Sequence, residues 1–341
     1  MNRLIIIGNG FDLAHGLKTK YSDFILWYLN RSLNEALSKG FYSDDFMVIT
    51  NHSHNVTITE DIKSFVDLER FKLKYPMINI DLPDRFFESL LKKMGSANWV
   101  DVEYEYYRNL VKIIKIINES DKVFLIEILN SSFDRIKKTF QDYLRNISLK
   151  INLDDTIIKH FEKIIDTKGK PSSTDFHILN FNYTSSIDNY MRYFGLPIDR
   201  VINIHGKLDD VDYPIIFGYG DEMDENYKLI ESHNNNTFLD HFKSFGYVRN
   251  DYYRKLMSFI ESSKYYVYIM GHSCGISDRV LLNTIFANEH CSKILLFYHK
   301  VSETENDYSV KVQEISRHFP PELKNRMRKI IEPFNLSTSL T

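Results

Sequence analysis

The feature that most constrains the fold is a short apolar run near the amino terminus that stops at a glycine turn. Leu4 to Ile7 contains only aliphatic residues, and Gly8, Asn9 and Gly10 follow directly. Such a run is typical of a strand buried on both faces of a parallel sheet. Glycines after the strand allow a tight turn and let backbone amides approach an anionic ligand. We therefore expect a parallel sheet with a phosphate-binding loop after its first strand.

This turn matches only part of the dinucleotide-binding fingerprint, which carries a third glycine. Leu13 stands where that glycine would fall, and Gly16 follows a little later. A glycine turn that simply joins a strand to a helix is the alternative interpretation of the segment.

Strands and helices alternate through the second half of the chain. Short apolar runs predict buried strands, and apolar residues at helical spacing between them predict helices. This alternation is typical of a doubly wound parallel sheet. The predicted strands are Phe176 to Phe181, Val201 to Ile204, Ile215 to Phe217, Tyr265 to Met270 and Ile294 to Tyr298, and the predicted helices are Thr184 to Tyr193, Tyr252 to Glu261, Ser277 to Asn288 and Tyr308 to His318.

The stretch between the first strand and this alternating half predicts helices with almost no strand signals. Apolar residues recur there at spacings of three and four, as at Leu110, Ile113 and Ile114. We therefore expect an α/β fold, a Rossmann-like doubly wound parallel sheet with a large helical insertion after the first strand. The predicted boundaries are 1–24 and 167–341 for the α/β nucleotide-binding core, 25–166 for the helical insertion subdomain, and Lys168 to Thr174 for the returning loop.

Composition excludes several classes of protein. The net charge of -3 offers no general attraction to nucleic acid, so a nucleic-acid partner is not expected. Cys274 and Cys291 are the only cysteines, too few for a disulfide framework or a four-thiolate zinc module, and we expect no metal. The apolar run before Gly8 is too short for a signal peptide or a spanning helix. These features predict a cytoplasmic protein without a membrane partner.

Two more motifs stand where predicted strands end. Asn182 follows the strand from Phe176, at the edge where an open α/β sheet binds its ligand, and its amide could orient a water. Capping of the next helix by Asn182 or Thr184 is the alternative. His205, followed by Gly206, ends the strand from Val201 and is a candidate general base because histidine titrates near neutral pH. A histidine that only stabilises a turn is the alternative there.

The fourth motif, Gly271-His272-Ser273-Cys274-Gly275, separates the strand from Tyr265 and the helix from Ser277. It matches the Gly-x-Ser-x-Gly nucleophile elbow of α/β-hydrolases. A serine hydrolase would need an acid and a histidine after Ser273. The candidates in that order are Asp278 or Asp307 with His299 or His318. Few residues follow Ser273, and the elbow leaves the first glycine turn unexplained, so we rank this alternative below a ligand-binding loop.

Taken in order, the four motifs resemble the AbiH family of bacteriophage abortive-infection proteins and, more distantly, the sirtuin superfamily of NAD-binding proteins. The most specific segment runs from Ile5 through Asp12 and Leu13 to Phe24. The Asn98 to Glu103 segment and the Gly271 motif with Asp278 also look like AbiH signatures. The resemblance extends over nearly the whole chain, but it depends on a small number of specific residues.

The sirtuin resemblance implies a dinucleotide site. It places the pyrophosphate on the first glycine loop, with the amides of Gly10 and Phe11 as donors and Asp12 near a ribose hydroxyl. It makes Asn182 and His205 the catalytic pair, and it gives Ser273 a role in binding the far ribose or phosphate. The expected ligand-binding residues are Gly8, Asn9, Gly10, Phe11, Asp12, Ser273 and Asp278.

The chain also departs from the sirtuin pattern. Two cysteines cannot form the zinc ribbon of protein-deacylating sirtuins, so the resemblance implies NAD hydrolysis rather than deacylation. Ile25 replaces the arginine of an Asp-Phe-Arg motif, and Thr184 replaces an aspartate. We expect an antiphage effector that hydrolyses the nicotinamide glycosidic bond after a phage-derived trigger or an accessory defence protein acts on it. Further copies of the same chain, in a homo-oligomer, are also among the expected partners. The alternative is a nucleotide or ADP-ribose sensor without turnover.

Overall fold

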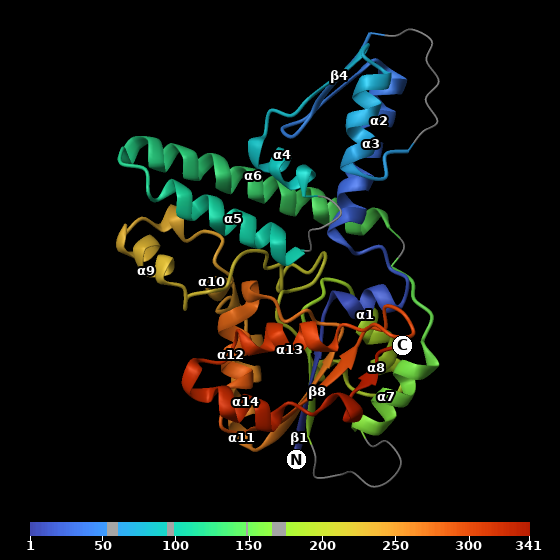
Figure 1. Cartoon of the computed structure of the whole chain (residues 1–341), viewed down its shortest axis with the longest axis vertical. Helices are drawn as coiled ribbons and strands as arrows, with labels where there is room; N and C mark the ends of the chain where they lie inside the picture. Colours follow the sequence, from blue (N-terminus) through green and yellow to red (C-terminus); the bar gives the residue numbers. More distant parts are fainter. Residues whose placement is uncertain (53–60, 94–98, 148, 166–174) are drawn as a thin grey trace. The chain divides into compact units, whose positions relative to one another are not determined.

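The computed structural model describes residues 1–52, 61–93, 99–147, 149–165 and 175–341. The chain forms two compact units, which are described separately (Figure 1). The first comprises Met1–Leu17, Ser148–Ser232 and His241–Thr341, and the second comprises Lys18–Ile147 and His233–Asp240. The predicted returning loop at 168–174, and Asn98 of the AbiH-like segment, lie outside the described residues.

A six-stranded sheet forms the centre of the first unit. Its order is β6-β5-β1-β7-β8-β9, and every neighbouring pair is parallel. The prediction of an α/β fold around a parallel sheet is therefore confirmed. The strands are β1 (Asn2–Ile7), β5 (Phe176–Asn180), β6 (Val201–Asn203), β7 (Tyr265–Met270), β8 (Cys291–Tyr298) and β9 (Thr338–Ser339).

Helices cover both faces of this sheet. Leu4 and Ile6 of β1 belong to the apolar core on one face, and Ile5 and Ile7 belong to the core on the other. This alternation explains why β1 is apolar throughout, since successive side chains of a strand point to opposite faces. Core residues on the first face come from α11 (Tyr252–Ser262), α12 (Arg279–Phe286), α13 (Tyr308–Ser316) and α14 (Lys324–Ile330), and those on the second from α1 (Asn9–Ala14), α7 (Asp155–Ile165) and α8 (Ser186–Tyr193).

In the first unit one predicted strand is wrong, and one strand of the parallel sheet was not predicted. Ile215 to Phe217 is buried but forms no strand. Ile216 instead donates its amide to the His205 carbonyl, 2.9 Å away, so the apolar run covers the loop after β6. The short β9 at the edge of the sheet has no long apolar run, and nothing in the sequence indicated it.

The second unit contains helices and a small antiparallel sheet of order β2-β3-β4. Its three strands were not expected, because they are short and only β4 alternates between buried and exposed residues. The helices are α2 (Tyr21–Lys39), α3 (Phe65–Lys74), α4 (Arg85–Lys92), α5 (Trp99–Ile113) and α6 (Glu119–Asn146), and the strands are β2 (Phe41–Ser43), β3 (Val48–Asn51) and β4 (Ile78–Asp81).

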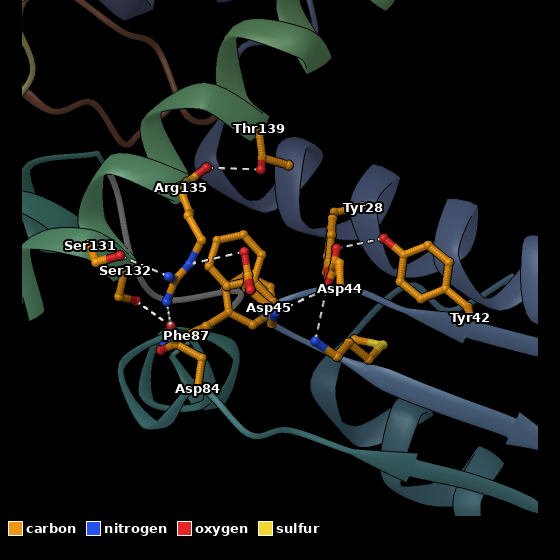
Figure 2. A network of polar contacts seen from close by, with 12 residues as sticks. Tyr28, Tyr42, Asp44, Asp45, Asp84, Phe87, Ser131, Ser132, Arg135 and Thr139 are labelled. Atoms are coloured by element: carbon orange, nitrogen blue, oxygen red, sulfur yellow. Dashed lines mark hydrogen bonds and ion pairs between the residues drawn. The ribbon is translucent and has the colours of Figure 1, made fainter. Parts of the chain in front are cut away.

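Polar contacts hold α4 and α6 of this unit together (Figure 2). Asp84 caps α4 by accepting the Phe87 amide at 2.8 Å. Its other oxygen accepts from Ser132 at 2.5 Å and from Arg135 at 3.1 Å, and both of these residues lie on α6. The carboxylate is therefore fully used inside the unit, which makes it structural. Among the described residues, no helix has the length and apolar character needed to cross a membrane.

Candidate functional site

Four strand-end motifs meet at the carboxyl edge of the parallel sheet. They follow β1, β5, β6 and β7, which are neighbours in the sheet. The Asn182 side chain donates to the Gly8 carbonyl at 3.1 Å, and the Gly10 amide donates to the Gly271 carbonyl at 2.8 Å. His205 Nε2 lies 3.2 Å from the Asp278 carboxylate, which belongs to the segment after β7. The structure thus brings together motifs that are dispersed along the sequence.

The glycines after β1 and β7 allow two loops to pack backbone against backbone. A Cβ on Gly8 would lie 2.7 Å from His272 Cα, and a Cβ on Gly10 would lie 2.7 Å from the Gly271 carbonyl oxygen. Gly271 has a φ of +79°, and its Cβ would lie 2.2 Å from the Phe11 nitrogen. Side chains at these positions would force the loops apart. The glycines are therefore explained by loop packing, whether or not a ligand approaches.

Backbone amides of the first glycine loop already have acceptors. The Gly10 amide donates to Gly271, and the Phe11 amide donates to the Gly8 carbonyl at 2.8 Å. Asn9 and Gly10 are half-buried, whereas the Phe11 side chain is fully buried against Phe161 and Tyr190. An anion bound to these amides would have to replace two hydrogen bonds.

Asp12 is buried, with 1% of its surface exposed, although it is ionisable. Its carboxylate accepts from the Thr184 hydroxyl at 2.7 Å and from the Ser186 hydroxyl at 2.5 Å. Burial raises the pKa of Asp12 to about 6, because loss of hydration outweighs the opposing effect of the hydrogen bonds from Ser186 and Thr184. Position 184, where the sirtuin pattern has an aspartate, therefore carries a threonine that donates to the carboxylate of Asp12 from the first glycine motif.

Asn182 is held by a chain of asparagines. Asn180 accepts the Asn182 amide through Oδ1 at 3.1 Å and donates to Asn203 Oδ1 at 2.9 Å. Asn180 ends β5 and Asn203 ends β6, so the parallel pairing of these strands sets the position of the loop that carries Asn182. The α8 helix begins only at Ser186, and no side-chain hydrogen bond caps it. The Asn182 side chain therefore does not cap α8, and it contacts the Gly8 carbonyl in the loop after β1 instead.

His205 belongs to a buried cluster of charged and titratable side chains. Asp278 Oδ1 accepts from Lys243 of α10 (Lys243–Tyr247) at 2.8 Å and faces His205 Nε2 at 3.2 Å. Its other oxygen lies 3.8 Å from His272 Nε2. The Phe181 ring packs against both imidazoles, with centroid distances of 5.0 Å to His205 and 4.1 Å to His272. The cluster is an oriented acid, base and cation excluded from bulk water.

The surroundings keep both imidazoles neutral. Burial lowers the pKa of His205, and the Lys243 charge lowers it further, against the opposing effect of Asp278. Burial lowers the pKa of His272 to about 3. Burial alone would raise the pKa of Asp278, but the Lys243 charge, followed by the interaction with His205 that includes a side-chain hydrogen bond, brings it below its ordinary value. Neutral His205 beside ionised Asp278 is the state in which a histidine accepts a proton.

The loop 271–275 is fixed by side chains from the carboxyl-terminal part of the chain. Buried Lys311 donates to the His272 carbonyl at 3.1 Å, and His318 Nε2 lies 2.7 Å from the Cys274 carbonyl. The Cys274 amide donates to His272 Nδ1 at 3.0 Å, and Cys274 has a φ of +57°. Ser273 between them is exposed. The loop therefore presents Ser273 outward on a rigid backbone.

The residues proposed for a serine-hydrolase triad have other contacts. His318 bonds the Cys274 carbonyl, and Asp278 is paired with Lys243 and His205. His299 is exposed, and Asp307 accepts the His299 backbone amide at 2.6 Å. Within the described part of the chain no hydrogen bond joins Ser273 to a histidine. The described contacts of this loop therefore do not include the acid and base that would activate Ser273 as a nucleophile.

Sequence reasoning missed Lys243 and Lys311, the two lysines that are buried at this site. Lys311 carried a usable signal, because it lies on the apolar face of α13 with Tyr308 and Ile315, at spacings of three and four. A lysine at such a position requires a polar partner. Lys243 follows a loop and has no periodic context, so no comparable signal marks it. In the described segments no group of three or more histidine, cysteine or acidic side chains could hold a metal ion.

The fold and this edge of the sheet define an α/β protein with a buried acid–base cluster next to a glycine loop. The chain belongs to the bacteriophage abortive infection AbiH family, which it matches over residues 4–300. This membership points to a role in abortive infection of phage-infected cells. A comparison with the curated proteins finds no match.

Proposed function

We propose that this protein binds NAD or a close relative and hydrolyses the nicotinamide glycosidic bond as its contribution to abortive infection. The observation that carries the proposal is the meeting of Asn182 and His205 with the glycine loops at one sheet edge. The strand order supports it. Numbered along the chain, the six strands lie in the order 3-2-1-4-5-6, as in dinucleotide-binding Rossmann folds. In such sheets the ligand lies at the carboxyl ends, where the order reverses between β1 and β7.

The chemistry requires one water and one base. The bond between the ribose C1′ and the nicotinamide nitrogen breaks, and nicotinamide leaves with the bonding electrons. The water oxygen bonds to C1′, and His205 takes the released proton. Asn182 orients the water against the developing positive charge of the sugar. Neutral His205 suits this role, and Asp278 holds the imidazole in place.

The binding roles follow the exposure of each group. Ser273 is exposed on its rigid loop and can donate to a ribose or phosphate oxygen. The Gly10 and Phe11 amides would hold the pyrophosphate after exchanging their present carbonyl acceptors for it. Asp278, 4% exposed and paired with Lys243, orients His205 instead of contacting the ligand. Loop rearrangement on binding accords with an activity that stays silent until a phage component triggers it.

The test is nicotinamide release from NAD by the purified protein, with and without phage lysate components. We expect release only with a trigger, and a loss of at least about 100-fold in Asn182→Ala and His205→Ala, as for removal of a general base. His299→Ala is the matched control, because His299 is exposed and distant in sequence from the cluster. Unchanged release in both site variants would refute the assignment.

A nucleotide sensor is the second candidate, and one observation favours it. Asn182 and His205 expose only 6% and 5% of their surfaces, which limits their contact with the glycosidic bond of a bound nucleotide but leaves exposed Ser273 free to bind one. A sensor would bind ADP-ribose or NAD without turnover. Calorimetry with each ligand separates the candidates, because stoichiometric binding without nicotinamide release in the presence of every trigger supports the sensor.

A further inference from the structure

Lys243 and His205 contact the same oxygen of one buried carboxylate. Lys243 Nζ donates to Asp278 Oδ1 at 2.8 Å, and His205 Nε2 lies 3.2 Å from that oxygen. The side chains of Lys243, Asp278 and His205 expose only 1%, 5% and 6% of their surfaces. Bulk water therefore cannot solvate a charge here, and each charge in this group depends on the others for compensation.

The formal charges of this group balance only while His205 is neutral. Asp278 is ionised and Lys243 carries one positive charge, so a neutral imidazole leaves the group without net charge. A proton on His205 would add a positive charge that nothing in the group compensates. Without the lysine, the same proton would supply the compensation that the carboxylate lacks. The ammonium thus takes the part in the charge balance that a histidine proton would otherwise take.

Among the described residues, the other titratable groups that face His205 or its carboxylate are uncharged. The Tyr247 hydroxyl of α10 lies 3.5 Å from His205 Nε2, and the Tyr183 ring stacks on the imidazole at a centroid distance of 6.2 Å. A phenol is neutral near neutral pH. His272 faces the other Asp278 oxygen at 3.8 Å, and burial lowers its pKa to about 3. The charge balance around His205 therefore depends on one carboxylate and one ammonium.

We propose that Lys243 is a positioning residue whose ammonium compensates the Asp278 carboxylate, so that His205 stays neutral and accepts the proton that hydrolysis releases. This inference rests on the proposed function, in which His205 is the base. It also favours one class of substrate. Once His205 holds the proton, the group carries one excess positive charge, and a ligand that brings phosphates to this edge of the sheet stabilises that state. Transfer of the proton to solvent then restores the neutral imidazole.

The experiment is an NMR titration of the histidine rings in the whole chain, with the His205 signals assigned by their loss in His205→Ala. Lys243→Met should raise the proton affinity of His205 at least about tenfold, because the carboxylate then lacks its ammonium. Lys243→Gln removes the same charge but keeps a hydrogen-bond donor for Asp278. It should give the same rise, and it serves as the test if the methionine variant does not fold.

The double variant Lys243→Met/Asp278→Asn separates charge from packing. It disturbs the same contacts, yet the affinity of His205 should return most of the way to the wild-type value, because neither charge remains. Lys207→Met is the matched control, since the Lys207 ammonium lies 3.6 Å from Asp188, and it should change the affinity less than about twofold.

Two results would overturn the role of Lys243. One is an unchanged His205 affinity in the folded single variants, and the other is an equal rise in the double variant. The titration needs no turnover, so it decides this role even if wild-type protein releases no nicotinamide with any trigger. That second result would refute the proposed function alone.

Discussion

Replacing Asp12 with asparagine should make the protein more stable near neutral pH and leave it little changed in acid. Burial raises the pKa of Asp12 from 3.8 to about 6. Each pKa unit corresponds to about 1.4 kcal/mol, so keeping this carboxylate ionised in the fold costs about 3 kcal/mol. Asparagine keeps the shape and removes the charge. The Ser186 hydroxyl can rotate to accept from the new amide.

The sign follows from proton binding. Between pH 3.8 and 6 the folded chain holds the Asp12 proton and the unfolded chain has lost it, so raising the pH through this window favours unfolding. The cost is absent below pH 3.8 and complete above pH 6. His272 and His318, with pKa values lowered by burial to about 3 and about 4, destabilise the fold in acid. They are present in both proteins and cancel in the difference.

The assay is urea unfolding of wild type and Asp12→Asn at pH 4, 5, 6, 7 and 8, followed by circular dichroism. Tryptophan fluorescence is unsuitable, because Trp27 and Trp99 both belong to the other compact unit. The free-energy difference between the variants should rise by about 2.4 kcal/mol from pH 4 to pH 7 and then level off, because about 0.5 kcal/mol of the cost is already present at pH 4. A free-energy difference that stays constant within about 0.5 kcal/mol over this pH range would refute the argument that ionised Asp12 destabilises the fold between β1 and β5. Asp199→Asn, the same kind of change at an exposed position, is the control variant.

Three further predictions concern the cluster and its loops. Gly271→Ala should lower the free energy of unfolding by roughly 3 kcal/mol or more, because the residue has a φ of +79° and its Cβ would clash with the Phe11 nitrogen. Urea unfolding measures this loss, and a loss below about 1 kcal/mol would contradict the packing of the two loops. Lys243→Met should cost about 3–5 kcal/mol by leaving the buried Asp278 charge uncompensated, and adding Asp278→Asn should recover most of it; a double-mutant cycle without coupling counts against the ion pair. A fluorophosphonate probe should leave Ser273 unlabelled, and labelling abolished by Ser273→Ala would restore the serine-hydrolase alternative.

The sequence predicts the central sheet well, because burial on both faces leaves a local signal. The runs from Leu4, Phe176, Val201 and Tyr265 each correspond to a parallel strand. The same signal fails at Ile215 to Phe217, where an apolar run packs over a loop, since burial and strand pairing require the same residue types. Short strands such as β2 and β9 contain too few residues for any periodicity.

The site is only partly predictable for a different reason. Asn182 and His205 could be chosen because strand ends are the usual place for ligand residues in such sheets. Their partners depend on tertiary contacts, so a sequence cannot reveal them. Asp12 contacts Thr184 across 172 positions of the chain, and Lys243 contacts Asp278 from a short helix without apolar periodicity. Only the structure shows which side chains hold the predicted site residues in place.

The hydrogen bonds from Lys311 and His318 to the 271–275 loop show that the loop depends on residues near the carboxyl terminus of the sequence. The AbiH match ends at residue 300, yet both side chains come from beyond it. A chain shortened to residue 300 would keep Ser273 and lose the two groups that bind the carbonyls on either side of it. The residues after the family match therefore stabilise the 271–275 loop at the carboxyl edge of the sheet, and a fragment cut at that boundary is a poor substitute for the chain studied.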